Sequence, residues 1–351
     1  MQKDMHFYGV YALARAAGIK PDTARIIAYA SQFVDDALEG EVNILENQKA
    51  IFPNITSHKP YDYKNTILRD QWKVWVPFHF LPGNQNIARS FIGKMICLKG
   101  IESKPAKAIL NHALDHKMKT YGAHLVGITA HVYADTFAHY GFVGLSSHRN
   151  KVRNYTIKVN VESRDIFKYI KNKFGTFITR VAGTIAEAVP VGHGAAATYP
   201  DRPYLKWEYK DETGKLVKRD NAKDFLTAFE HLYIFFYNFV QDQPVYGKPN
   251  SEGWSEIKNV IKNIIEKEGK KEDRIKQWKT AIAGDKMFPS TKKDKSIKYS
   301  DEEWMPHNIQ KHLAVHGTLD TCNACLFIQA AWKHKNYILY ELLPDNDLIA
   351  C

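Results

Sequence analysis

The pattern of apolar and polar positions predicts a chain built mainly from amphipathic helices. Apolar residues recur at helical spacing over 6–17 and again in "PDTARIIAYASQFVDDAL", which begins at Pro21. Gly18 and Pro21 are residues typical of a helix end and a helix beginning. Similar periodicity predicts further helices at 105–139 (with a bend near Gly122), 163–188, 222–240, 252–268, 270–284 and 307–341. We therefore expect a mainly α fold.

Strand-like alternation is convincing in one place. The segment "YLKWEYKDETGKLVKRDN" alternates around a glycine turn and predicts a small β-hairpin insertion at about 203–219. Asn221 is expected to cap the helix that follows. Residues 40–85 are rich in loops, and Pro77 and Pro82 are expected to hold an extended backbone there.

The length of 351 residues allows a single large domain. We expect one multi-helical domain over 1–351, with 248–300 as a basic helical and loop insertion or subdomain. The longest apolar run, 232–240, is far shorter than the roughly 20 residues that span a bilayer, so no transmembrane segment is expected. The first residues show no clean signal peptide, which favours a cytoplasmic location.

The net charge of +11 is unevenly distributed. Residues 248–298 hold 14 Lys and Arg against 8 Asp and Glu. Such a segment can attract an anionic partner, because basic side chains raise the local concentration of phosphates. It can equally be the solvated face of surface helices.

Candidate chemistry begins with "HVYADTFAHY". His131, Asp135 and His139 stand four residues apart, so that their side chains share one helix face among apolar neighbours. Buried ionisable groups are costly unless they are paired or bound to a metal. The sequence leaves two interpretations open, a metal site and a hydrogen-bonded polar core.

Four other segments offer similar residues in apolar or glycine-bracketed settings. They contribute His6, the adjacent Asp35 and Asp36, His79 between Phe78 and Phe80, and His193 between Gly192 and Gly194. Imidazole and carboxylate ligands without thiolate suit Zn, Mn or Fe, and zinc is the first choice. A residue eight positions along a helix is about 12 Å away, so His139 is expected to serve a second ion or a supporting role.

Cys322 and Cys325 form a single CxxC motif. The motif is compatible with a redox pair or with half of a zinc site. It is also compatible with two small core residues on one helix face, which we favour because no second CxxC exists.

The order of the candidate ligands resembles the zinc-dependent phospholipase C and S1/P1 nuclease superfamily. The matching residues, in order, are His6, Asp35 or Asp36, His79, His131 and Asp135. The resemblance implies an all-helical fold and a zinc cluster that hydrolyses phosphoesters. In that superfamily the next histidine follows the aspartate by six residues, whereas His139 follows Asp135 by four.

A closer resemblance rests on four longer blocks. The blocks "HFYGVYALARAAG", "ASQFVDDA", "HVYADTFAH" and "VGHGAAATYPDRP" are similar to an uncharacterised family of bacterial helical proteins. This resemblance implies a helical fold and importance for these blocks, and it implies no reaction.

Two functions follow as hypotheses. The first is a metal-dependent hydrolase of a phosphoester or related bond in a small molecule, with Asp35 or Asp36 as general base or bridging carboxylate. Arg202 would bind the anion, because guanidinium pairs bidentately with phosphate, and Tyr199 would contact the substrate. The second is a non-catalytic helical interaction protein with a structural polar core and a basic partner-binding region at 248–298.

Overall fold

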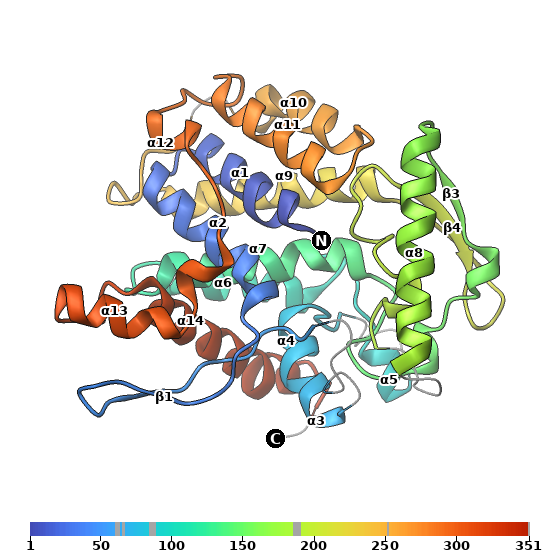
Figure 1. Ribbon diagram of the computed structural model, residues 1–351, viewed down its shortest axis with the longest axis horizontal. Coiled ribbons are helices and arrows are strands. Elements are labelled where there is room, and N and C mark those ends of the chain that lie inside the picture. The colour runs from blue at the N-terminus through green and yellow to red at the C-terminus, as the bar shows by residue number, and fades with distance from the viewer. Residues whose placement is uncertain (60–63, 65–66, 84–88, 185–190, 251–252, 350–351) are drawn as a thin grey trace.

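The protein is described by a computed structural model over residues 1–59, 64, 67–83, 89–184, 191–250 and 253–349 (Figure 1). The chain is mainly helical with two small antiparallel sheets, which confirms the predicted fold class. No helix among these residues is long and apolar enough to cross a membrane.

Helix α7 (Gly122–His139) forms the centre of the fold, and each of its residues is buried. Its most extensive contacts are with α2 (Pro21–Asp36), α6 (Lys104–Asp115), α9 (Asn221–Val240) and α14 (Asn323–Tyr337), and Figure 1 shows it among them. The helical stretch predicted over 105–139 with a bend near Gly122 is two helices, because the chain turns between α6 and α7. A Cβ on Gly122 would lie 2.3 Å from the carbonyl oxygen of Lys117, so that this turn needs glycine.

The contact between α2 and α7 is unusually close. A Cβ on Gly127 of α7 would lie 2.3 Å from the carbonyl oxygen of Ile27 and 2.7 Å from the Cβ of Ala30. Small residues on both helices therefore let the two backbones approach. This contact brings the last turn of α2 beside the middle of α7.

The first predicted helix is present as a π-helical turn η1 (Asp4–Gly9) followed by α1 (Val10–Ala16). Gly18 has a φ of +100° and ends this segment as expected. Residues of η1 and α1 are almost all buried, and the segment packs against α2, α9 and α11 (Lys271–Ala283).

The segment around His79 is helical, so that the predicted extended backbone is wrong. It consists of α3 (Leu68–Asp70), π-helical η3 (Gln71–Trp75) and α4 (Val76–Phe78). Pro77 stands in the first turn of α4, where a helix does not need its missing N–H. The His79 backbone N–H donates to the Trp75 carbonyl oxygen at 3.0 Å.

The hairpin is confirmed as β4 (Lys206–Lys210) and β5 (Leu216–Asp220), with Glu208 opposite Lys218. A third strand, β3 (Lys158–Asn160), pairs with β4. This sheet and α8 (Arg164–Thr184) enclose a second, smaller core. The remaining small elements are β1 (Asn43–Ile44), β2 (Ala50–Ile51), α5 (Phe91–Lys94), η4 (His148–Asn150), η5 (Asn154–Thr156) and η6 (Gly194–Ala196).

Asn221 does not cap α9. The Asp220 carboxylate accepts the Lys223 N–H at 3.2 Å and takes that role, while Asn221 is the first helical residue. The Asn221 side-chain amide donates to the carbonyl oxygens of Tyr199 and Arg202, both at 2.8 Å. The residue therefore ties the loop at 199–202 to the start of α9.

The basic region contains α10 (Trp254–Glu266), α11 and α12 (Lys292–Lys295), which pack on η1, α2 and α9. Asp294 of α12 is buried and accepts hydrogen bonds from Tyr11 and Arg15 at 2.6 and 2.7 Å. The predicted helix at 307–341 is divided into α13 (His307–His316) and α14, because Gly317 adopts a φ of +68°. The chain continues through η7 (Asp301–Trp304), η8 (Ile338–Leu342) and α15 (Leu343–Asp345).

Candidate metal centre

The three polar residues of α7 form one continuous stripe, as their spacing predicts. Oδ2 of Asp135 lies 3.1 Å from His131 Nε2 and 3.6 Å from His139 Nδ1. His131 and Asp135 are completely enclosed, with exposed fractions of 0% and 1%. The stripe therefore lies inside the protein, where its polar side chains need hydrogen-bond partners or opposite charges from other segments.

Three segments packed against α7 supply such polar partners. His6 of η1 places its Nε2 3.1 Å from Asp135 Oδ1, and its ring stacks on the ring of His131. His79, just after α4, places its Nδ1 3.2 Å from Asp135 Oδ2. Asp35, in the last turn of α2, lies with its Oδ1 3.9 Å from His131 Nε2. These residues make two groups with potential ligand atoms within 4.8 Å of one another, namely His6–Asp35–His131 and His79–His131–Asp135.

A third group forms at the end of the stripe, from His139, His193 and Asp201. His193 Nε2 lies 3.1 Å from His139 Nε2, and Asp201 Oδ1 lies 3.5 Å from the same nitrogen. Gly192 has a φ of +53°, and a Cβ there would overlap the Phe80 ring. The absence of a side chain at Gly192 therefore lets the loop backbone pack against Phe80.

The hydrogen bonds of His79 and His131 decide which ring nitrogens carry protons. His131 Nδ1 lies 2.7 Å from the Ser31 carbonyl oxygen, and His79 Nε2 lies 2.9 Å from the Thr56 carbonyl oxygen. Because a carbonyl oxygen only accepts, each of these nitrogens must donate. The opposite nitrogen of each neutral ring then has a lone pair. These two lone pairs face each other at 3.3 Å beside the Asp135 carboxylate.

The same arrangement recurs in the third group. His139 Nδ1 lies 2.8 Å from the His79 carbonyl oxygen, and His193 Nδ1 lies 2.8 Å from the Ala197 carbonyl oxygen. Both Nε2 atoms therefore present lone pairs to each other. Oδ1 of Asp201 is buried beside them, 3.3 Å from the Met1 amino group.

Facing lone pairs of this kind can share a cation placed between them. A bound proton would make one ring an imidazolium in a buried site, and burial lowers the pKa of His193 to about 4. Burial likewise holds the pKa of His6 well below its usual value. Carbonyl groups that orient the outer nitrogens of histidines are the usual support of metal ligands. The buried His and Asp groups could therefore bind a metal ion.

Two members connect the centre with solvent. The Asp35 side chain is 31% exposed and the His193 side chain 18%, whereas His6 and His131 are fully buried. Burial of the carboxyl group raises the pKa of Asp35. A reacting molecule would therefore meet the centre at Asp35 or at His193.

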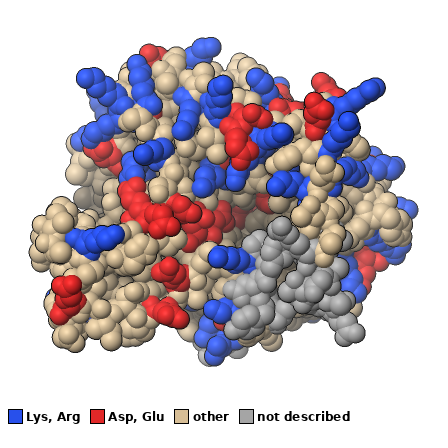
Figure 2. All heavy atoms as spheres, in the orientation of Figure 1, with Lys and Arg blue, Asp and Glu red and all other residues tan. Residues whose placement is uncertain are grey.

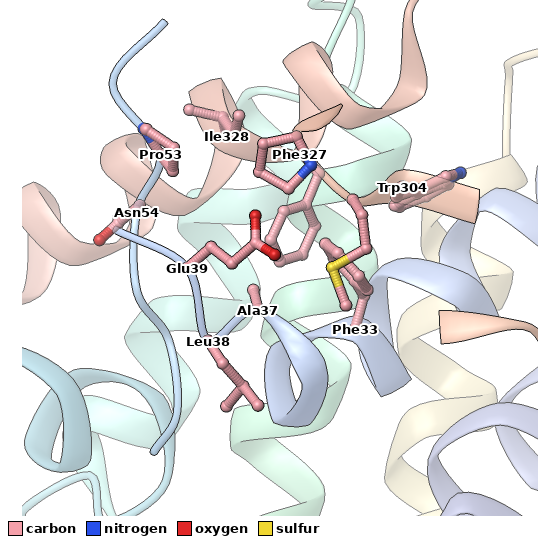
Figure 3. Close-up of a pocket in the computed structure, with 11 residues that line it drawn as sticks. Phe33, Ala37, Leu38, Glu39, Pro53, Asn54, Trp304, Phe327 and Ile328 are labelled. Carbon is pink, nitrogen blue, oxygen red and sulfur yellow. The ribbon is translucent and has the colours of Figure 1, made fainter. Parts of the chain in front are cut away.

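The small apolar pocket beyond the end of α2 is a separate feature (Figure 3). It measures about 20 Å³, and its walls include Phe33, Trp304 and Phe327. The Glu39 side chain points into it in Figure 3. The pocket has room for about one water molecule and touches no member of the three groups, so it does not hold a substrate.

The adjacent carboxylates Asp35 and Asp36 have different surroundings. Asp36 accepts the Tyr299 hydroxyl at 2.6 Å and the Gln32 side-chain amide at 3.0 Å. It belongs to none of the three groups. The structure thus places Asp35, and not Asp36, against the histidines.

Arg202 and Tyr199 lie in the second core, both buried. Arg202 donates to the Thr198 hydroxyl at 3.0 Å and lies over the Tyr169 ring. The Arg202 Nε and the Tyr199 hydroxyl have no hydrogen-bond partner among the described residues. Two buried donor groups in the loop that carries Asp201 thus lack a hydrogen-bond partner among the described residues.

Two members of the candidate centre, Asp201 and the Met1 amino group, are not predicted from the sequence. The available signal for Asp201 was an acidic residue in the same loop as His193. The Met1 amino group lies 2.6 Å from Asp135 Oδ1 and 3.3 Å from Asp201 Oδ1. Burial opposes its charge, but Asp135 and Asp201 outweigh burial and raise its pKa to about 11.

Comparisons with known proteins place the chain in a family without describing its activity. No curated protein and no solved structure matches it. One family model matches residues 1–342, which include the described ligands of all three groups. On the strength of that match over nearly the whole chain, the protein belongs to the family of unknown function DUF6765.

Proposed function

We propose that the protein is a metal-dependent hydrolase that cleaves a phosphoester or a related bond. The observation that carries the proposal is the set of facing lone pairs, on His79 and His131 beside Asp135 and on His139 and His193 beside Asp201. A structural polar core would pair donors with acceptors, whereas in neutral rings the four facing histidine nitrogens are all acceptors.

The donor set supports a divalent transition metal. The three groups offer imidazole nitrogen and carboxylate oxygen and no thiolate. This combination suits zinc, with manganese or iron as alternatives. The order of His6, Asp35, His79, His131 and Asp135 along the chain resembles the zinc-dependent phospholipase C and nuclease superfamily, which favours zinc and phosphoesters.

The proposal assigns a chemical role to each part of the candidate centre. His131, Asp135 and the residues grouped with them would hold a metal ion, which would lower the pKa of coordinated water toward about 7 and polarise the scissile group. Asp35 is the most exposed carboxylate of the groups, and its raised pKa suits it to accept a proton from attacking water. Arg202 and Tyr199 are the proposed anion-binding residues, because their unused donors lie in the loop that carries Asp201.

The experiment combines metal content with activity. Protein purified in metal-replete buffer is analysed for bound elements and assayed with bis(p-nitrophenyl) phosphate. We expect about two equivalents of a transition metal and measurable hydrolysis that a chelator abolishes. His131→Ala should lose both metal and activity, whereas His148→Ala, which changes an exposed histidine paired with Glu212, should lose neither.

Two results would overturn the proposal. Wild-type protein without bound metal after metal-replete purification would favour the alternative of a non-catalytic interaction protein. Full metal content without hydrolysis of phosphomonoester, phosphodiester or carboxylic ester probes would leave a metal site but exclude the hydrolase.

A further inference from the structure

A pair of thiols lies at the N-terminal end of α14, outside the metal centre. Cys322 is the residue before the first helical position and Cys325 is the third residue of the helix. Both are free thiols. A disulfide joins Cα atoms about 4.4–6.8 Å apart, a range that residues three positions apart in a helical turn satisfy. The two thiol groups also lie close enough to hydrogen-bond with each other, so the pair can form a disulfide.

The surroundings of Cys322 favour its thiolate. The Cys325 S–H and the backbone N–H groups of Cys325 and Ala324 donate to its sulfur and lower the pKa of its thiol to about 6. Cys325 donates in this pair, and its own pKa is raised. A low-pKa thiol followed by a second cysteine at i+3 is the arrangement of a nucleophilic cysteine with its resolving partner.

The thiol of Cys322 borders a pocket of about 150 Å³. The pocket is lined by Glu303, Trp304, Asn308, His312, Thr321, Cys322, Asn323 and Ala324. It is several times larger than the pocket in Figure 3 and more polar. A small sulfur compound can therefore approach Cys322 from outside although the residue itself is only 3% exposed.

The end of α14 is held rigidly against α7. Asn323, between the two cysteines, pairs its Oδ1 with Nε2 of buried His124 at 3.0 Å. Trp304 packs against His124 with ring centroids 5.2 Å apart. Neither cysteine belongs to a group of three potential metal ligands among the described residues. The pair thus lacks the further ligands that a structural zinc site needs.

We propose that Cys322 and Cys325 form a dithiol–disulfide redox site that reduces low-molecular-weight disulfides. The Cys322 thiolate attacks one sulfur of the substrate disulfide, breaks its S–S bond and releases one thiol, which takes up a proton. Cys325 then loses its proton and attacks Cys322, which releases the second thiol. Two electrons pass from the protein to the substrate, and the protein is left with a Cys322–Cys325 disulfide.

Alkylation of the reduced native protein tests the nucleophile. Iodoacetamide labelling, read by peptide mass spectrometry, should modify Cys322 with a pH midpoint near 6. Cys97 is the internal control, because it is buried and burial raises the pKa of its thiol. We expect Cys322 to react at least tenfold faster than Cys97 at pH 7. Equal rates, or a Cys322 midpoint above 8, would overturn the proposal.

Glutathione disulfide as the probe tests the resolving step. Wild-type protein should form the internal disulfide and release two thiols per chain. Cys325→Ser should stop at a stable mixed disulfide of Cys322 with glutathione, visible in the intact mass, and Cys322→Ser should form neither product. No mixed disulfide in a Cys325→Ser protein with wild-type melting temperature would refute the assignment. If Cys325→Ser does not fold, Cys325→Ala serves the same purpose. Metal content should be unaffected in both variants, which separates this site from the metal centre.

Discussion

At the residue scale, the adjacent carboxylates of Asp35 and Asp36 give the most direct test of the proposed metal centre. Asp35→Asn should lower metal affinity by more than about 10-fold, since even outer partners of metal ligands are worth that much. Asp36→Asn should leave metal affinity within a few-fold of wild type, because Asp36 bonds Tyr299 and Gln32 instead of the histidines. Chelator competition titration of both variants measures the difference. Equal losses in the two variants would contradict the assignment of Asp35 as the ligand.

Most residues of the candidate metal centre could be predicted from the sequence, because each stands among apolar residues or glycines, which are unusual neighbours for an ionisable side chain. An ionisable side chain among apolar residues, as for His131 and Asp135, signals burial directly. Asp201 carries no such signal, since an aspartate between proline and arginine also suits an exposed turn. Its place in the third group depends on the Asn221 hydrogen bonds that hold its loop, and no local pattern encodes those.

At the scale of elements, the contact between α2 and α7 controls the position of Asp35. Gly127→Ala should destabilise the protein by about 1–3 kcal/mol, the usual cost of overpacking, and should lower metal content as well. Gly175→Ala is the matched control, because Gly175 lies in α8, is exposed and has no atom near its Cβ position. It should be neutral or stabilising by up to about 1 kcal/mol, the helix preference for alanine.

Thermal or urea unfolding of both glycine variants gives the comparison. A Gly127→Ala protein as stable as wild type would show that the two helices can separate without cost. That result would contradict the close contact between the backbones of α2 and α7.

His124 makes α7 sensitive to pH. Burial lowers its pKa to about 4, below the usual value of 6.5. Both states are neutral above pH 6.5, but below it the unfolded chain gains the proton first, so the free energy of unfolding falls as pH falls toward 4. Between pH 7 and pH 5 this loss is about 2 kcal/mol.

Urea unfolding of metal-depleted protein at the two pH values measures this dependence. His124→Gln cannot titrate and keeps an amide for Asn323, so its unfolding free energy should fall about 2 kcal/mol less than that of wild type. Parallel pH profiles for the two proteins would disprove the contribution of His124.

The elements that periodicity predicted are present, and their interruptions were harder to predict. Apolar spacing continues across 105–139 and 307–341, yet the chain turns within each stretch. Tertiary packing determines where these helices are interrupted. At Gly122 the backbone passes close to the Lys117 carbonyl group, and Gly317 adopts a left-handed conformation. The strand β3 was missed because three residues give too short an alternation, and its pairing with β4 comes from elsewhere in the chain.

At the scale of the whole molecule, charged side chains of each sign gather on different parts of the face drawn in Figure 2. Figure 2 shows Lys and Arg gathered over the upper helices α10–α12, and Asp and Glu in a band across the middle of the same face. The binding of an anionic partner at 248–298 stays a prediction, as does the division of the chain at 248–300. The described helices of this region pack on η1 and α9, and Arg274 of α11 forms a buried ion pair with Asp4 at 2.6 Å.

Removal of the metal should affect the entire fold, because its proposed ligands come from η1, α2, α7 and two loops. A ligand that binds only the native state stabilises it by about 4 kcal/mol at 1,000 times its Kd. We expect chelator treatment to lower the melting temperature by several degrees and zinc to restore it. A melting temperature that does not respond to chelation and zinc would be incompatible with a metal centre that joins these segments.

The spread of the ligands along the chain also has a consequence for biosynthesis. His6 leaves the ribosome well before Asp201 and the Asn221 that holds its loop, which come much later in the chain. Contacts between residues so far apart form slowly, since the intervening chain must first be closed into a loop. A nascent chain that has reached only α7 already contains His131 and Asp135 but has no third group to complete. The newborn protein would therefore acquire all of its proposed ions only after the loop with Asp201 and the start of α9 had been translated.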